Sequence, residues 1–288
     1  MGQFLKKVAR SVGLGKYQDR TLLEVAHAAY RSRDFEKAHR LLLPLAEQGE
    51  RPYRDVAQII LGGLYFAGQG VEKDDVTAAR WMRLAATSSN VPFVQRSVGN
   101  NFRLGQGEPK DLREAIKGLR KAAVNGHAPS QLDLGKLFED GIDGIPDYEK
   151  AAYWYRQVIA QPTYTPDGPN AKKTDSMIEA IEADHHPSNE EFADAKMRLG
   201  LLLLDGRGVP KDYVEAARHL RDAADLGRLS AMTLLGSMYE DGLGVSQDFA
   251  RAASWYTIAA ENGFVLAQDR LAILLSSGKV QYVPSSGP

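Results

Sequence analysis

Apolar residues recur at helical spacing through most of the chain. In one representative stretch, Leu199, Leu202 and Leu203 fall on a single face of a helix. A second apolar stretch follows after a short break, and there small residues precede bulky ones, as Ala217 precedes Leu220. Small residues let two helices approach closely, so the pattern predicts pairs of amphipathic helices packed on one another.

Glycines give this pattern a period of 36 or 37 residues. Gly62, Gly99 and Gly135 are 37 and 36 residues apart, and Gly200 and Gly236 are 36 apart. A Gly-x-Gly follows at a constant offset at Gly68/Gly70, Gly105/Gly107, Gly206/Gly208 and Gly242/Gly244. Glycine readily takes the left-handed conformation that ends helices, so each pair predicts a tight turn. The spacing of 65 between Gly135 and Gly200 predicts an insertion of 29 residues.

A helix pair of this kind cannot bury its apolar face alone, so a repeated pair indicates a stack of neighbours. We therefore expect an all-α protein, an α/α superhelical solenoid of about six helix–turn–helix repeats plus a C-terminal capping helix. The predicted array covers 22–279, with units at about 22–50, 55–89, 92–127, 128–160, 193–227 and 228–263, a cap at 264–279 and an insertion at 161–192. A basic amphipathic segment at 1–21 and a flexible tail at 280–288 are expected to flank the array.

Three short sequence motifs occur together, with variation, in the repeated units. They read Leu-Gly-x-Leu-Tyr-x-x-Gly-x-Gly-Val-x-x-Asp, then Ala-Ala-x-Trp-Tyr, then Ala-Ala-x-x-Gly, with versions at 235–248, 252–256 and 259–263. This combination resembles the Sel-one-like repeat, a longer-looped relative of the tetratricopeptide repeat, over about residues 22–279. The resemblance implies an α-solenoid used for protein–protein contact, often as an adaptor in signalling or at the bacterial envelope. It does not imply catalysis.

Composition narrows the possible functions. The chain is 43% hydrophobic and 25% charged, which is typical of a folded protein. Its 36 basic and 37 acidic residues leave a net charge of -1, so we do not expect nucleic-acid binding. The chain has no cysteine, which excludes disulfides and thiolate metal sites and fits a reducing compartment best. We expect a cytoplasmic protein, with peripheral attachment to a membrane as the alternative.

The N-terminal residues 1–16 interleave charged and apolar side chains, so no signal peptide is expected. No stretch of the chain approaches the roughly 20 apolar residues of a membrane span. The initial Met-Gly lacks the Ser or Thr at position 6 that myristoylation requires, because Lys6 stands there. Phe4, Leu5 and Val8 still form an apolar side. Two interpretations stay open: docking on a membrane surface, or a helix that covers the first repeat.

Candidate catalytic and cofactor motifs are weak. The Gly-x-Gly pairs follow helices in every unit, so they do not indicate a nucleotide-binding loop, which follows a strand. His185 and His186 lie near several carboxylates, but adjacent histidines seldom bind one ion. We therefore predict no catalytic residue, no cofactor and no metal. The insertion at 161–192 is either a binding loop or a tolerated surface loop.

Acidic residues stand in register just before the glycine pairs. In related solenoids this end of the first helix lines the concave face, which makes it the candidate binding surface. The candidate residues are Arg96, Asn100, Arg103, Lys136, Glu139, Asp140, Asp205, Ser237, Glu240 and Asp241. Carboxylates at the C-terminal end of a helix oppose its dipole, which suggests that they serve another purpose. The alternative is that they are charged because helix ends are exposed.

These observations favour a non-catalytic scaffold or adaptor that binds a protein partner, such as a basic helix or peptide tail, on its concave repeat surface. The alternative is an envelope- or membrane-associated accessory or inhibitor protein that docks through the N-terminal amphipathic helix. Trp81, Trp154 and Trp255 are expected to fill the space between units rather than to bind ligands.

Overall fold

The computed structural model describes residues 14–162 and 187–280. Within these ranges it contains 13 helices and no strand, apart from an isolated bridge between Ile142 and Ile145. The expected all-α class is confirmed. The predicted tail at 280–288, all but its first residue, and most of the insertion at 161–192 lie outside the described residues, as do the first 13 residues of the N-terminal segment.

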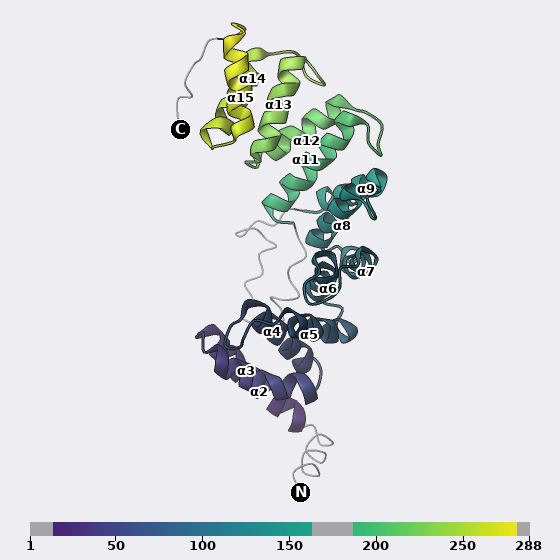
Figure 1. Ribbon diagram of the computed structural model, residues 1–288, viewed down its shortest axis with the longest axis vertical. Coiled ribbons are helices and arrows are strands. Elements are labelled where there is room, and N and C mark those ends of the chain that lie inside the picture. The colour runs from purple at the N-terminus through teal and green to yellow at the C-terminus, as the bar shows by residue number, and fades with distance from the viewer. Residues whose placement is uncertain (1–13, 163–186, 281–288) are drawn as a thin grey trace. The chain divides into compact units, whose positions relative to one another are not determined.

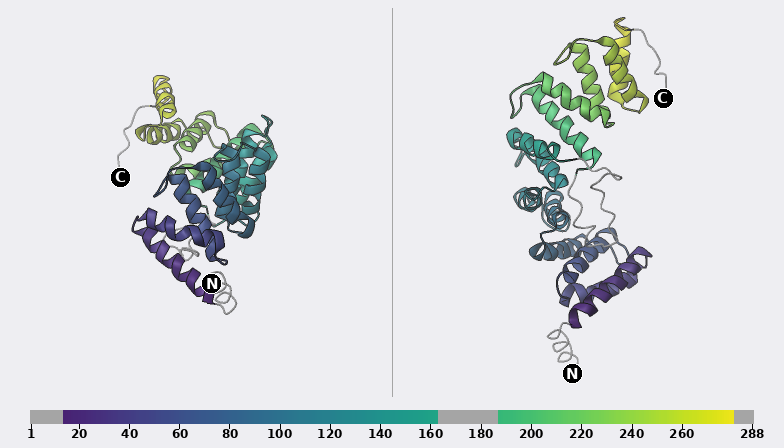
Figure 2. Two further views of the ribbon diagram at one scale, coloured as in Figure 1. Left: turned by 60° about the horizontal axis from the view of Figure 1, so that its bottom comes forward. Right: turned by 180° about the vertical axis from the view of Figure 1, so that it is seen from behind.

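The chain divides into two compact units, one up to Asn125 and one from Gly126 onward apart from part of the insertion. The first unit contains α2 (Leu14–Arg31), α3 (Phe35–Gln48), α4 (Tyr53–Ala67), α5 (Asp75–Ser88), α6 (Pro92–Leu104) and α7 (Leu112–Ala123). The second contains α8 (Ala128–Asp140), α9 (Tyr148–Ile159), α11 (Asn189–Asp205), α12 (Tyr213–Asp225), α13 (Leu229–Asp241), α14 (Phe249–Glu261) and α15 (Val265–Ser276). In each unit, helices that follow one another in sequence pack side by side (Figures 1 and 2).

Two helices begin earlier than the sequence pattern predicts. The helix α2 starts at Leu14, inside the segment that we assigned to 1–21. The helix α11 starts at Asn189, so the insertion ends before 192. The sequence offers Ser188 or Asn189 as the cap of this helix, and Ser188 is the N-cap: its side chain accepts a hydrogen bond from the Glu191 backbone N–H, and the Glu191 carboxylate accepts one from the Ser188 backbone N–H. This reciprocal cap fixes the start of the helix ahead of its first apolar residue.

The first of the two repeated contacts joins the two helices of a hairpin at a glycine. In five hairpins the glycine of the first helix lies against the residue 20 positions later in the second helix. These pairs are Gly62 with Met82, Gly99 with Leu119, Gly135 with Tyr155, Gly200 with Leu220 and Gly236 with Tyr256. A Cβ atom at these glycines would come within 2.3–3.0 Å of the facing side chain. The glycine therefore sets how closely the two helices approach.

The second repeated contact joins neighbouring hairpins through the Gly-x-Gly turn. Both glycines of the four turns have φ between 65° and 72°, so the first ends its helix in the left-handed conformation. The second glycine lies against the first turn of the preceding hairpin's second helix. The contacts are Gly70 with Glu36, Gly107 with Asp75, Gly208 with Glu149 and Gly244 with Tyr213, and a Cβ there would lie 1.9–2.5 Å from backbone atoms. The turns thus hold adjacent hairpins together.

An aspartate begins the second helix of every hairpin. Asp34, Asp74, Asp111, Asp147, Asp212 and Asp248 are the N-cap residues, and each side chain accepts a hydrogen bond from a backbone N–H of the first turn. Such a cap typically contributes about 1 kcal/mol. The recurring Asp of the sequence motif is therefore a capping residue.

The aromatic residues of the second helices pack largely as expected. Trp81 and Trp154 are buried, whereas Trp255 is only half-buried. Tyr155 and Tyr256 are fully buried against the helix glycines. None of the helices in the described part of the chain combines the length and the apolar character needed to cross a bilayer.

We expect Gly135→Ala to lower the free energy of unfolding by about 1–3 kcal/mol, because the new methyl group would overpack the buried ring of Tyr155. Urea denaturation monitored by circular dichroism measures the change. The matched control is Gly63→Ala, also inside a helix, where nothing lies within 4 Å of the new Cβ. That variant should gain about 0.5–1 kcal/mol from helix propensity. Equal effects of the two substitutions would contradict the close-approach role of Gly135.

Candidate binding surface

The structure places three of the predicted binding residues in the first unit. Arg96, Asn100 and Arg103 all lie on α6, three or four residues apart, so they share one face of the helix. The Nε atom of Arg103 donates a hydrogen bond to Oδ1 of Asn100 at 2.9 Å. All three side chains are partly exposed. This face of α6 is polar and carries two positive charges.

The other seven predicted residues lie in the second unit, near the C-terminal ends of three first helices. They are Lys136, Glu139 and Asp140 on α8, Asp205 on α11, and Ser237, Glu240 and Asp241 on α13. The three aspartates are the last residues of their helices and each stands five positions after the helix glycine. The structure therefore keeps the register that the sequence indicated.

The most connected residue of the second unit is Asp194 in α11, which the sequence pattern did not single out. Its side chain is only 6% exposed and contacts three cations. Lys136 Nζ lies 2.6 Å from Oδ2, while Arg228 Nη2 and Arg198 Nε lie 2.8 and 3.3 Å from Oδ1. Burial acts to raise the pKa of Asp194, but the hydrogen bond from Lys136 and the nearby Arg198 and Arg228 charges outweigh it, so the pKa falls below its usual value.

Arg198 extends this network to Glu139. Its Nη1 atom lies 2.9 Å from Oε2 of Glu139, and the Tyr155 hydroxyl donates a hydrogen bond to the same oxygen. Burial, followed by the bond to Glu139, raises the pKa of Tyr155 far above its ordinary value. The carboxylate of Glu139 therefore joins α8, α9 and α11, and its charge is compensated within the unit.

Glu240 repeats part of this arrangement one repeat before the C-terminal helix. The Tyr256 hydroxyl donates to Oε2 of Glu240 at 3.0 Å, and the two residues are 16 positions apart, as are Tyr155 and Glu139. Burial and then the charge of Glu240 raise the pKa of Tyr256, whereas the charge of Arg270 opposes the rise. Both glutamates of the predicted set thus bind a buried tyrosine of their own hairpin.

The aspartates of the set are more open. Asp140, Asp205 and Asp241 are exposed. Asp205 forms an ion pair with Arg207 at 3.0 Å, in which both side chains are about half exposed, and Asp241 accepts a hydrogen bond from Ser237 at 3.4 Å. Among the described residues, no cation forms an ion pair with Asp140 or Asp241. These three carboxylates are therefore less enclosed than those of Glu139 and Glu240.

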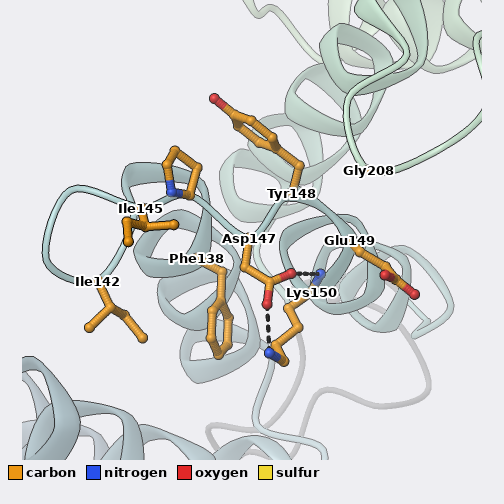
Figure 3. Close-up of a pocket in the computed structure, with 9 residues that line it drawn as sticks. Phe138, Ile142, Ile145, Asp147, Tyr148, Glu149, Lys150 and Gly208 are labelled. Carbon is orange, nitrogen blue, oxygen red and sulfur yellow. Dashed lines mark hydrogen bonds and ion pairs between the residues drawn. The ribbon is translucent and has the colours of Figure 1, made fainter.

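A pocket of 480 Å³ lies beside the end of α8. Its walls come from Phe138, the loop residues Ile142, Ile145 and Pro146, the first turn of α9 and Gly208 (Figure 3). Asp147 caps α9 and binds Lys150 Nζ at 2.5 Å. The Lys150 ammonium also lies 5.5 Å from the centre of the Phe138 ring. The pocket therefore has an apolar side on the loop and a charged side on the first turn of α9, and the lysine among its lining residues is already paired.

Sequence reasoning missed the Asp194 network and this pocket. The spacing of Asp194 and Arg198 identifies them as a possible i, i+4 pair. Their partners on α8, Lys136 and Glu139, lie about 60 residues earlier in the sequence. The insertion between them interrupts the repeat period, so the period does not align the two helices. The pocket was missed because its loop lacks the Gly-x-Gly motif, so no repeated signal marked it. His185 and His186 lie outside the described residues, and no group of three or more metal-binding side chains occurs within them.

Comparison with known proteins identifies the class to which these hairpins belong. The Sel1 repeat family model matches residues 28–50, 55–90, 94–127, 128–161, 193–227 and 229–264, which is well over half of the chain. The chain belongs to the Sel1 repeat family. Proteins of this family generally mediate protein–protein contact.

The chain is also similar to several individual proteins. A Sel1 repeat protein from Oxalobacter formigenes is 26% identical, with a TM-score of 0.63 over 92% of this chain and 94% of that chain. The uropathogenic Escherichia coli protective antigen c5321, described as displaying an SLR fold, is 25% identical, with a TM-score of 0.44 over 91% of this chain and 65% of that chain. The uncharacterized protein NMB1327 of Neisseria meningitidis is 27% identical over 219 residues, 73% of this chain and 44% of that protein. The chain thus spans less than half of that relative.

We expect Asp194→Asn to destabilise the protein by about 2–4 kcal/mol, because it leaves three cations around a neutral, buried side chain. The pKa of Asp194 is lowered on folding, so the carboxylate stabilises the fold above its unfolded value of about 4 and this stabilisation is lost as pH falls below it. The difference between the two proteins should therefore shrink on acidification. Urea denaturation at several pH values measures it.

The control for this prediction is Asp205→Asn, which removes a carboxylate from an exposed ion pair in the same helix. Exposed pairs contribute little, so the control should change the free energy of unfolding by no more than about 0.5 kcal/mol. A difference between wild type and Asp194→Asn that stays constant down to pH 3 would contradict the role assigned to this carboxylate.

Proposed function

We propose that this chain is a non-catalytic scaffold whose second unit binds a basic helix or peptide tail of a protein partner. The partner would lie along the ends of the first helices, α8, α11 and α13. Membership of the Sel1 repeat family supports a protein partner in general terms. The more specific choice of a basic segment rests on the carboxylates described above.

The observation that carries the proposal is the register of three exposed aspartates. Asp140, Asp205 and Asp241 end three first helices at the same position of the repeat. A negative charge at a helix C-terminus opposes the helix dipole and costs about 0.3–1 kcal/mol. The same hairpins use aspartate to favourable effect at the N-termini of their second helices. Stability therefore explains the capping aspartates but not these three, which favours a binding role for them.

The cations of the second unit do not cancel this charge. Lys136, Arg198 and Arg228 all bind Asp194, and Arg198 also binds Glu139. Among the described residues, only Arg207 forms an ion pair with an aspartate of the row Asp140, Asp205 and Asp241. That pair is exposed, so an incoming Lys or Arg can replace it at little cost. A basic segment would thus meet a row of carboxylates at low desolvation cost and with favourable long-range attraction.

The buried tyrosines of the same hairpins support a packing role over a chemical one. The raised pKa of Tyr155 and of Tyr256 keeps both hydroxyls protonated near neutral pH, as donors to Glu139 and Glu240. A protonated donor held in this way stabilises its hairpin and does not serve as a base or nucleophile. The alternative of membrane docking through the N-terminal segment rests on residues that mostly lie outside the described part of the chain, and it stays a prediction.

We expect the double variant Asp140→Lys, Asp241→Lys to weaken partner binding by about tenfold or more, because two attractive charges become repulsive. The experiment is affinity capture from the native cell, in which quantitative mass spectrometry compares the partner recovered by the variant and by wild type. Capture by the wild-type chain should fall as salt increases, since exposed charges are screened.

The matched control is Glu72→Lys, Asp225→Lys. It makes the same change in net charge at two exposed acids away from the row, one in a loop and one at the end of a second helix. The control should retain the partner. Recovery of the same partner at the same level by both double variants would overturn the acidic-row proposal while leaving the family assignment intact.

A further inference from the structure

We infer that the pocket between α8 and α9 binds an apolar side chain of the partner, so that the recognised segment carries an aliphatic or aromatic residue flanked by Lys or Arg. The inference rests on the proposed function, because it assumes a basic protein segment. It adds an apolar anchor residue in the partner, the sequence pattern expected around that residue, and the residues of this chain that would contact it.

The first support is the exposure of apolar side chains at the pocket. Ile145 is 75% exposed, more than any other large hydrophobic residue in the described part of the chain. It lies across a tight turn from Ile142, where each residue donates its backbone N–H to the carbonyl of the other at 3.2 and 3.0 Å. Figure 3 shows both isoleucines on the loop that follows α8, and Phe138 on α8 itself; all three line the pocket. Ile145 therefore presents an apolar side chain to solvent at this pocket.

The second support is that the repeat does not require these isoleucines. The turn from Gly141 to Asp147 has the same length as the four Gly-x-Gly turns, so positions correspond one to one. The residues that correspond to Ile145 are Glu72, Pro109, Pro210 and Ser246. This turn also lacks the second glycine of the motif, and Asp143 takes a φ of 54° in its place. Because the other hairpins pack without an isoleucine here, packing of the hairpin does not account for Ile145.

The third support is the charge around the pocket. Residues 139–150 contain the five acids Glu139, Asp140, Asp143, Asp147 and Glu149, and the one cation Lys150. Lys150 already binds Asp147 and lies over the Phe138 ring. Arg207, whose guanidinium lies 5.6 Å from the centre of the Tyr148 ring, already pairs with Asp205. Asp140 and Glu149 are exposed. An apolar side chain entering the pocket would therefore bring its neighbouring residues next to carboxylates, which selects Lys or Arg on either side of it.

The pocket has room for an anchor residue. A volume of 480 Å³ lies in the range of pockets that hold small ligands, and it exceeds the volume of a single Leu, Met or Phe side chain. Anchors of this kind dominate the binding energy of many protein interfaces, while the surrounding charges contribute mainly to specificity and to the rate of association. The pocket would thus supply most of the affinity, and the row of aspartates would contribute specificity and speed association.

The test is selection from a random peptide display library on the wild-type chain, followed by fluorescence anisotropy with the enriched peptides. We expect enrichment of peptides with an aliphatic or aromatic residue next to Lys or Arg. Replacing that residue by Ala in the peptide, or Ile145 by Ser in the protein, should each weaken binding about tenfold or more, because apolar contact is lost. The two changes together should cost little more than either alone.

Val214→Ser is the matched control, because Val214 is 68% exposed on the second unit but lies away from the pocket. It should leave binding unchanged, and thermal melts should show that both variants stay folded. Basic peptides that bind Ile145→Ser as well as wild type, yet fail on the Asp140→Lys, Asp241→Lys variant, would overturn the anchor site and leave the proposed function standing. A library without any enriched basic peptide would overturn both.

Discussion

The close approach of helices at glycine is the constraint on which the rest of this structure depends. A single hairpin leaves one apolar face exposed to water. It buries that face only if its two helices pack closely and neighbouring hairpins pack against it. One glycine in the first helix brings the two helices together, as Gly135 does with Tyr155, and a second glycine in the turn brings the next hairpin into place, as Gly208 does with Glu149. Everything else, from the capping aspartates to the buried tyrosines, is arranged around these two contacts.

Sequence reasoning reached most of the fold because those glycines are both structural and periodic. Their spacing gave the class of fold and the helical hairpins, and the Asp after each turn gave the start of the second helix. The predicted unit boundary at 193 lay after the start of α11, although Ser188 was a candidate cap, because the boundary followed the apolar pattern and that pattern begins after the capped first turn. The start of α2 was missed because basic residues near Leu14 interrupt the apolar face that the pattern relies on.

The candidate site was harder to predict because it depends on pairing between helices. The register placed Glu139 and Glu240 beside the exposed aspartates, but a periodic pattern cannot show that a tyrosine 16 residues later binds each glutamate. It also cannot show that Arg198, which follows the insertion in sequence, reaches Glu139, which precedes it. The Ile142–Ile145 turn was not predicted because it departs from the repeated Gly-x-Gly motif, so the periodic pattern gives no signal for it.

The hub at Asp194 has a consequence for how this chain tolerates change. Lys136, Arg198 and Arg228 come from three successive segments of the second unit, and one carboxylate serves them all. Loss of the acid removes the ion pairs of Lys136 and Arg228 and leaves Arg198 with Glu139 alone, whereas loss of one base leaves two to compensate the acid. Evolutionary substitution at these four positions should therefore be unequal. Each base can be replaced singly, whereas the acid can be replaced only together with the bases that it pairs with.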